Sequence, residues 1–176
     1  VSVVASPAAA QQKAALPALV TSIGQSLDGF QTQLSMRRAQ IENEYEALAG
    51  TDLLDGKKTL LLAVGASLKG FGEAGTNMQK EVKRTEELLE AAKQKGLFIV
   101  VLHIGGLERR DKNTDQLLEL TVPKANLVIV RLEGDEDEMI RKLAAASKVP
   151  VRTVDTVVNM RPILREVFGL PPLPAG

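Results

Sequence analysis

The sequence contains no cysteine and no tryptophan among its 176 residues, and aromatic residues make up only 3% of it. Without cysteine the chain forms no disulfide, and thiol nucleophiles and cysteine-based metal sites are excluded. The scarcity of aromatic side chains argues against a base-stacking platform for nucleic acid and against a carbohydrate-stacking cleft. The core must therefore be built mainly from Leu, Val, Ile and Ala.

The sequence also lacks a net charge, because 22 basic side chains balance 22 acidic ones. No overall field draws the protein to nucleic acid or to anionic lipid, so neither is expected as a partner. After the first residues there is no run of about 20 apolar residues, so we expect no segment that spans a membrane. Hydrophobic residues at 44% and charged residues at 25% are typical of a globular domain.

Residues 1–10 are apolar and small, and Ala8-Ala9-Ala10 fits the A-x-A pattern of a signal-peptidase site. This pattern predicts the end of a signal peptide, a mature chain from Gln11, and a secreted or periplasmic location. The alternative is an Ala-rich extension without a targeting role. We expect a signal-peptide remnant and flexible N-terminal segment at 1–17, a single α/β domain at 18–170 and a Pro-rich tail at 171–176.

Short apolar runs alternate with longer amphipathic segments along the chain. Nearly continuous apolar runs at 58–64, 97–102 and 126–130 are typical of strands covered on both faces. Further strands are predicted at 19–23, 44–49 and 151–154, and helices at 30–41, 78–95, 138–147, 162–168 and from a cap at Asn113 or Thr114 to Leu120. This alternation predicts a three-layer α/β/α sandwich with a mostly parallel sheet, flavodoxin-like or Rossmann-like.

The unusual loops all follow predicted strands, at 22–29, 65–75, 103–111 and 133–135. In an open parallel sheet, ligands bind beyond the carboxyl ends of the strands. One of these loops contains a G-x-G-x-x-G pattern at Gly70, Gly72 and Gly75. The next strand ends without an acidic residue for a ribose, and no Lys-Ser/Thr pair completes a Walker A motif. Nucleotide binding is therefore disfavoured, and no cofactor is expected.

Glycine-rich loops let backbone N–H groups approach an anion, and Lys69, Arg109 and Arg110 add positive charge beside them. A guanidinium group suits a carboxylate or phosphate held by two hydrogen bonds. The alternative is that the arginines are solvated or pair with nearby acids such as Asp115. The residues predicted to contact a ligand are Gln25, Ser26, Asp28, Ser67, Lys69, Gly70, His103, Gly105, Gly106, Arg109, Arg110 and Asp115.

His103, the single histidine, ends a predicted buried strand and is a candidate proton carrier or anion donor. The alternative is a buried, hydrogen-bonded structural histidine. A catalytic triad is disfavoured because the sequence has no G-x-S-x-G elbow. Metal-ligand spacing is not recognisable around His103, so no metal site is expected. The polar residues of the first loop have their own alternative role, which is to cap the following helix.

Three sequence motifs in these loops are specific when they are taken together: Ile23-Gly-Gln-Ser-Leu-Asp, Val64-Gly-Ala-Ser-Leu-Lys-Gly-Phe-Gly and Leu102-His-Ile-Gly-Gly-Leu-Glu-Arg-Arg. With them the chain resembles an uncharacterised bacterial family, the domain of unknown function 6305, from about Ala18 to Leu170. The resemblance implies an exported protein and no particular activity. The sequence departs from the family pattern after the arginine pair, where Asp115 is the counterpart of a family aspartate within an altered loop.

Three hypotheses follow from the sequence. The first is an extracytoplasmic protein that binds a small anionic molecule, as an accessory to a transporter or sensor. The second is an enzyme that acts on a carboxylated or phosphorylated substrate, hydrolase-like or otherwise, with His103 as acid or base and open to the pocket. The third is an interaction protein whose Gly-rich loops contact a partner chain, with Phe71 and Leu107 exposed beside them.

Overall fold

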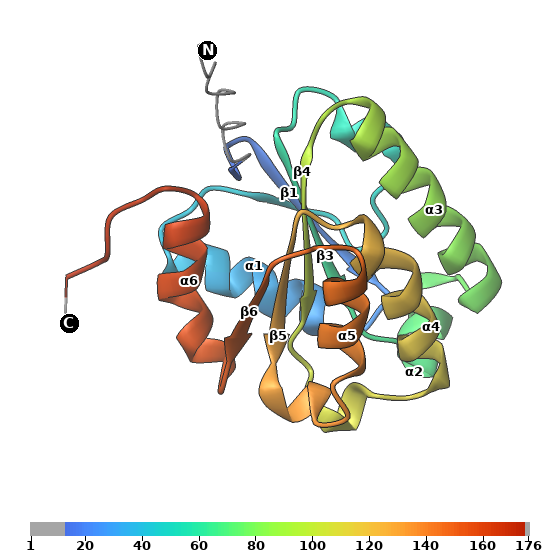
Figure 1. Cartoon of the computed structure of the whole chain (residues 1–176). Coiled ribbons are helices and arrows are strands. Elements are labelled where there is room, and N and C mark those ends of the chain that lie inside the picture. The colour runs from blue at the N-terminus through green and yellow to red at the C-terminus, as the bar shows by residue number, and fades with distance from the viewer. Residues whose placement is uncertain (1–12, 175–176) are drawn as a thin grey trace, which may run out of the picture.

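A computed structural model describes residues 13–174 of the chain. Six strands form one all-parallel sheet in the order β2-β1-β3-β4-β5-β6, with helices on both faces (Figure 1). The strands are β1 (Ala18–Ile23), β2 (Glu44–Tyr45), β3 (Thr59–Val64), β4 (Phe98–His103), β5 (Leu127–Arg131) and β6 (Val151–Val154). The predicted three-layer sandwich with a parallel sheet is confirmed.

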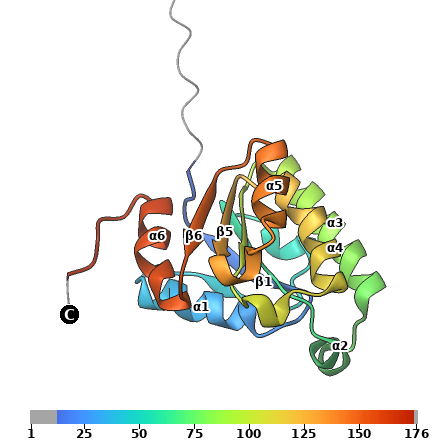
Figure 2. The same ribbon diagram turned by 60° about the horizontal axis from the view of Figure 1, so that its bottom comes forward.

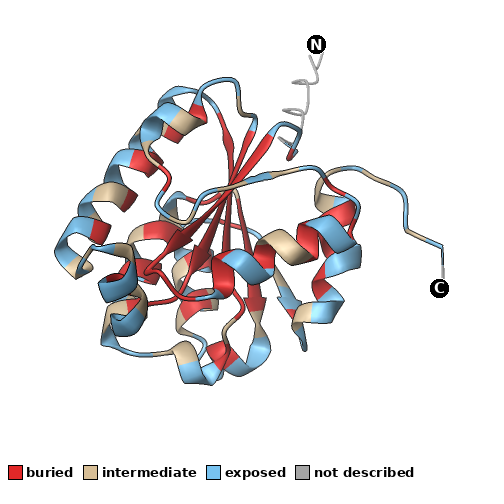
Figure 3. Cartoon of the chain, turned by 180° about the vertical axis from the view of Figure 1, so that it is seen from behind, coloured by how far each residue is buried: buried red, intermediate tan, exposed pale blue. Residues whose placement is uncertain are grey.

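The central strands are buried along their whole length, as their apolar sequences require (Figure 3). Side chains alternate between the two faces of a strand. Leu60 and Leu62 of β3 therefore contribute to one hydrophobic cluster, and Leu61 contributes to the other. The sheet thus separates two cores, each closed by its own layer of helices.

Figure 2 shows the two helical layers on opposite sides of the strands. One layer holds α3 (Met78–Gln94), α4 (Lys112–Thr121) and α5 (Met139–Ala146), and the other holds α1 (Asp28–Arg38) and α6 (Met160–Val167). None of the described helices combines the length and apolar composition needed to cross a membrane. Residues 1–12, on which the signal-peptide prediction falls, lie outside the described part of the chain.

The strand order changes direction at β1, because β2 lies on one side of β1 and β3 on the other. The loops that follow β1 and β3 therefore meet at this switch point. The N–H of Ser67 donates to the carbonyl of Gly24 at 2.8 Å, and the N–H of Ser26 donates to the carbonyl of Gly65 at 3.2 Å. In sheets of this kind the switch point is the usual ligand position.

Several predicted boundaries are wrong. The second strand covers only Glu44–Tyr45, because the chain turns where Glu46 accepts the N–H of Leu48 at 3.1 Å. The predicted loop 65–75 contains a short helix, α2 (Leu68–Ala74), which the Ser67 side chain caps. Helix α4 begins at Lys112, because Asp111 rather than Asn113 or Thr114 accepts the first free N–H. Other helix ends differ from the predictions by less than one turn.

The buried central strand predicts a large difference between two leucine truncations. Leu62→Ala, at a position with no exposed surface, is expected to lower the free energy of unfolding by about 2–5 kcal/mol because it opens a cavity. Leu68→Ala, at a position 77% exposed, should change it by less than about 0.5 kcal/mol. Urea denaturation of both variants measures the difference. Equal effects would contradict the two-core arrangement.

Candidate functional site

Asp28, the first residue of α1, places a buried carboxyl group at the carboxyl ends of β3 and β4. The residue is 3% exposed, and its Oδ2 accepts no hydrogen bond from any of residues 13–174. Oδ2 lies 2.6 Å from the position that a Cβ would take at Gly65 and 2.8 Å from that position at Gly105. The two glycines thus make room for this carboxyl group. Burial raises the pKa of Asp28, and the Ser26 hydroxyl and the charges of His103 and Arg109 partly oppose that shift.

His103, the last residue of β4, has no exposed surface. Its Nδ1 lies 2.9 Å from the carbonyl oxygen of Val64, which can only accept, so Nδ1 carries the proton of the neutral ring. Nε2 is then an acceptor, and it has no partner of hydrogen-bond geometry within the described chain. Burial lowers the pKa of His103 despite the hydrogen bond to Val64. The ring matches the structural alternative, and it is not open to a pocket.

The two neighbouring arginines have different environments. Arg110 pairs through Nε with Asp115 at 2.6 Å and through Nη2 with Asp137 at 2.9 Å, and its Nη1 donates to the carbonyl of Gly134 at 2.6 Å. These bonds raise the pKa of Arg110 and use most of its donors. Arg110 and Asp115 therefore form the ion pair that the sequence left open as an alternative to ligand binding.

Arg109 is the cation that remains. Its Cβ and Cγ lie over Gly105, at 2.8 and 2.2 Å from the position of an added Cβ. The side chain is half-buried and forms no ion pair with an acidic group in the described range. Its charge nevertheless acts on Asp28. The side chain of Arg109, unpaired within residues 13–174, thus lies across Gly105 from the buried carboxyl group of Asp28.

The predicted cationic loop after β3 contains helix α2, and Lys69 lies on the exposed surface of that helix. The Lys69 side chain is 86% exposed and lies 3.7 Å from Glu73 on the same helix. Gly70 allows α2 to pack on the first loop, because an added Cβ would stand 2.0 Å from the carbonyl oxygen of Gln25. Ser67 caps the helix, and Gly75 ends it at φ +68°. These glycines serve packing and capping, and they form no dinucleotide loop.

Several backbone N–H groups of the first two loops are bonded to protein acceptors. These bonds include Gly24 N to Glu81 Oε1 (2.8 Å), Ala66 N to Thr114 Oγ1 (2.9 Å), Gly65 N to Ile23 O (2.9 Å) and Ser67 N to Gly24 O (2.8 Å). The N–H groups of Gly105 and Gly106 have no such acceptor within residues 13–174. The spare backbone donors for an anion therefore include those of the turn after β4.

Sequence reasoning missed Glu81, a fully buried carboxylate on α3. It accepts hydrogen bonds from Gly24 N, from Gln25 Nε2 at 3.0 Å and from Arg84 Nη2 at 2.6 Å. Gln25, predicted to contact a ligand, is instead turned toward this carboxylate with φ +60°. A signal was available, because Glu81 shares a helix face with the buried Leu88.

A second omission is Arg131, at the end of β5. Its Nη1 lies 3.2 Å from the position of an added Cβ at Gly106, and it pairs with Glu133 at 2.5 Å. Its buried Nε has no partner within the described residues. Sequence analysis assigned this arginine to no loop, because it lies at the junction of a strand and a turn.

Exposed apolar side chains gather at the same edge of the sheet. They follow the carboxyl ends of several strands: Leu27, Leu68, Leu107, Leu132 and Val158. Of the two residues that the partner-chain hypothesis expected to be exposed, Leu107 is 56% exposed whereas Phe71 is only 4% exposed.

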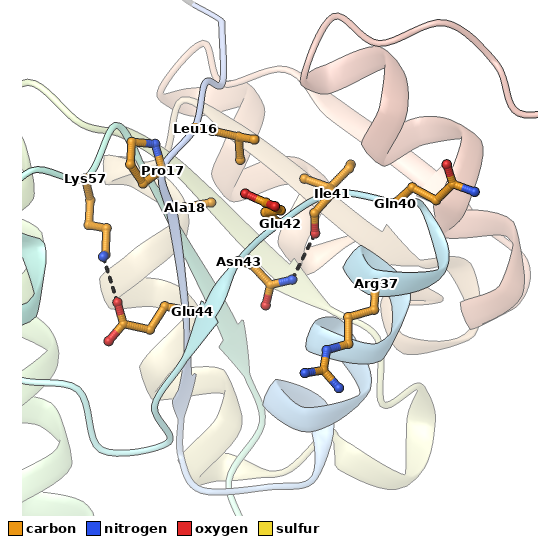
Figure 4. A pocket seen from close by; sticks show the side chains of 10 residues that line it. All are labelled: Leu16, Pro17, Ala18, Arg37, Gln40, Ile41, Glu42, Asn43, Glu44 and Lys57. Atoms are coloured by element: carbon orange, nitrogen blue, oxygen red, sulfur yellow. Dashed lines mark hydrogen bonds and ion pairs between the residues drawn. The ribbon is translucent and has the colours of Figure 1, made fainter.

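Two hollows lie at the opposite edge of the sheet, and the sequence predicted neither. One, of about 750 Å³, lies beside the amino ends of β1 and β2 between Pro17, Ile41 and Lys57 (Figure 4). Lys57 there pairs with Glu44 at 2.7 Å. The other, of about 880 Å³, lies at the amino ends of β4 and β5. Residues 13–174 contain no group of three or more His, Asp or Glu side chains placed to hold a metal ion.

Loss of the Glu81 charge is expected to destabilise the fold. Glu81→Gln keeps the shape but leaves Arg84, whose side chain is 14% exposed, without its counter-charge. We expect the free energy of unfolding to fall by about 3–5 kcal/mol, as for other broken buried pairs. The exposed Glu86→Gln on the same helix is the matched control in urea denaturation. An equal, small effect of both changes would show that Glu81 does not hold the first loop.

The buried histidine predicts a loss of stability in acid. The pKa of His103 lies below its ordinary value of 6.5 in the folded state, so the unfolded chain binds more protons below about pH 6.5. The free energy of unfolding should therefore fall from about pH 7 to pH 5, by at most about 1.4 kcal/mol per pH unit. His103→Gln should flatten this slope in urea titrations. Asp28→Asn should not, because the raised pKa of Asp28 acts in the opposite direction.

The comparisons with known proteins give one match. A family model described as a domain of unknown function (DUF6305) matches residues 15–168. No curated protein and no solved structure matches the chain. The match covers most of the chain, including Asp28, His103 and Arg109, and it confirms the resemblance carried by the three loop motifs. The chain belongs to the DUF6305 family.

Proposed function

We propose that the protein is an extracytoplasmic binding protein for a small anionic molecule, held by Arg109 at the carboxyl ends of β3 and β4. The observation that carries this proposal is the half-buried Arg109, which forms no ion pair within residues 13–174. Across Gly105 it faces the buried Asp28, whose Oδ2 has no hydrogen-bond partner in the same range. Charged and polar groups in such positions lower the stability of the fold unless a ligand or another partner satisfies them, and they are frequent at functional sites. The extracytoplasmic location is supported by the composition of residues 1–10.

Arg109 is suited to the anionic group of the ligand. A guanidinium group binds a carboxylate or phosphate by two parallel hydrogen bonds, which are stronger than neutral ones. The N–H groups of Gly105 and Gly106 have no acceptor in the described chain and lie in the same turn. Lys69 and Arg110, which the sequence also proposed, are engaged with Glu73 and with Asp115. Arg109 is therefore the centre of the proposed site.

The two other hypotheses have less support. An enzyme with His103 as acid or base needs that ring in contact with substrate, and His103 has no exposed surface. A partner chain would cover exposed side chains such as Leu27 and Leu107, but nothing in residues 13–174 indicates which chain that would be.

Anion binding predicts a ligand-dependent rise in melting temperature. In a thermal-shift screen with inorganic phosphate, mono- and dicarboxylates, a bound anion at a hundred times its Kd stabilises the fold by about 2.7 kcal/mol. This corresponds to roughly 5–10 °C for a chain of this size. Arg109→Ala should abolish the rise, and Lys69→Ala, the matched removal of an exposed cation, should keep it.

Two results would contradict the proposal. One is a flat response of the wild-type chain to every anion of the panel. The other is a response that Arg109→Ala leaves unchanged, which would place any anion site elsewhere on the molecule.

A further inference from the structure

We infer that the ligand carries a hydrogen-bond donor beside its anionic group, as in an α-amino or α-hydroxy carboxylate, and that Asp28 accepts that donor. This inference rests on the proposed function and names its ligand class. The observations behind it are the acceptor atoms at the site that have no donor, whereas the proposed function is argued from the cation Arg109.

Two buried acceptors at this edge of the sheet have no donor among residues 13–174: Oδ2 of Asp28 and Nε2 of His103. Nε2 is an acceptor because Nδ1 donates to Val64. A buried acceptor without a donor costs free energy that a bound donor restores. These two atoms therefore await a donor from a ligand, while Arg109 and the spare N–H groups of Gly105 and Gly106 supply donors for its anionic group.

Asp28 and Arg109 meet at Gly105. Oδ2 of Asp28 and Cγ of Arg109 lie 2.8 and 2.2 Å from the same point, the position of an added Cβ at Gly105. Asp28 is 3% exposed, whereas Arg109 is half-buried. The side chain of Arg109 is thus the more accessible of the two to a ligand from solvent. In an α-amino or α-hydroxy carboxylate, the anion and the donor are separated by one carbon atom, so one small ligand presents both groups to this pair.

A bare anion fits the site less well. A carboxylate or phosphate held by Arg109 would stand close to the carboxyl group of Asp28, and when Asp28 is ionised the two like charges repel at low dielectric. An ammonium or hydroxyl group next to the anion turns that repulsion into a hydrogen bond. The acceptor at Asp28 therefore selects for a ligand with both groups.

Matched ligands test this selection by titration calorimetry on the full chain. Alanine and lactate carry carboxylate and donor, propionate carries the carboxylate alone, and propylamine carries the amine alone. Leucine, leucate and isocaproate repeat the comparison with a longer apolar chain. We expect a Kd at least tenfold lower for the ligands with both groups than for their simple carboxylates, and no binding of propylamine.

Variants at Asp28 separate the roles of its charge and its acceptor. Asp28→Ala should remove the discrimination, so that alanine and propionate bind alike. Asp28→Asn, which keeps the size and an acceptor oxygen, should retain the preference for lactate and lose at least tenfold in affinity for alanine. Glu73→Ala, at an exposed acid on α2, is the control that should bind like wild type. Circular dichroism confirms that each variant is folded.

The outcomes distinguish this inference from the proposed function. If propionate and phosphate bind as tightly as alanine and lactate, the anion site stands and the inference is wrong. The inference is also wrong if Asp28→Ala keeps the full preference for alanine and lactate. If no anion of either series binds, the proposed function itself fails.

Discussion

The carboxylate of Glu81 joins the helical layer to the loop that begins at the switch point of the sheet. It accepts the N–H of Gly24 and the side-chain amide of Gln25, and Arg84 neutralises it from the same helix. Arg84 extends the connection to the carbonyl of Ala49 at 3.0 Å, in the segment after β2. Helix α3 thereby sets the path of the chain between β1 and α1, and that path delivers Asp28 to its buried position.

The glycines at this edge are explained by the polar side chains that they accommodate. A Cβ at Gly65 or Gly105 would collide with Asp28, and a Cβ at Gly134 would stand 2.8 Å from Nε2 of His103. The Gly-rich loops thus surround two buried titratable groups, and most of the N–H groups of the first two loops are bonded within the protein. The reason for the glycines differs from the one that the sequence suggested, although the position in the fold is the same.

Fold class and most strands were predictable because they depend on local patterns. Apolar runs such as 58–64 must be covered on both faces, and their alternation with amphipathic segments leaves few arrangements. The short β2 was not predictable, since its end depends on a turn held by the side chain of Glu46. Helix α2 was also missed, because four glycines in 65–75 outweighed the cap at Ser67.

The roles of single residues at the site were less predictable than the position of the site in the fold. Loops after parallel strands share one edge, so the meeting of Asp28, His103 and Arg109 followed from topology alone. Which of two adjacent arginines would be unpaired did not, because that choice depends on the reach of Asp115 and Asp137 to Arg110. Glu81 was taken for one charge among many on an amphipathic helix, since its partners come from a strand end far away in the chain.

The contrast between the two edges of the sheet bears on where function lies. The hollow beside β1 and β2 is lined by side chains that pair with one another, such as Lys57 with Glu44, or that face solvent. The carboxyl edge holds buried atoms of Asp28 and His103 that have no hydrogen-bond partner among residues 13–174. An open groove costs the fold little, whereas unsatisfied buried groups cost it stability. These unsatisfied groups are the reason that we propose the binding site at the carboxyl edge, with Arg109 as its cation.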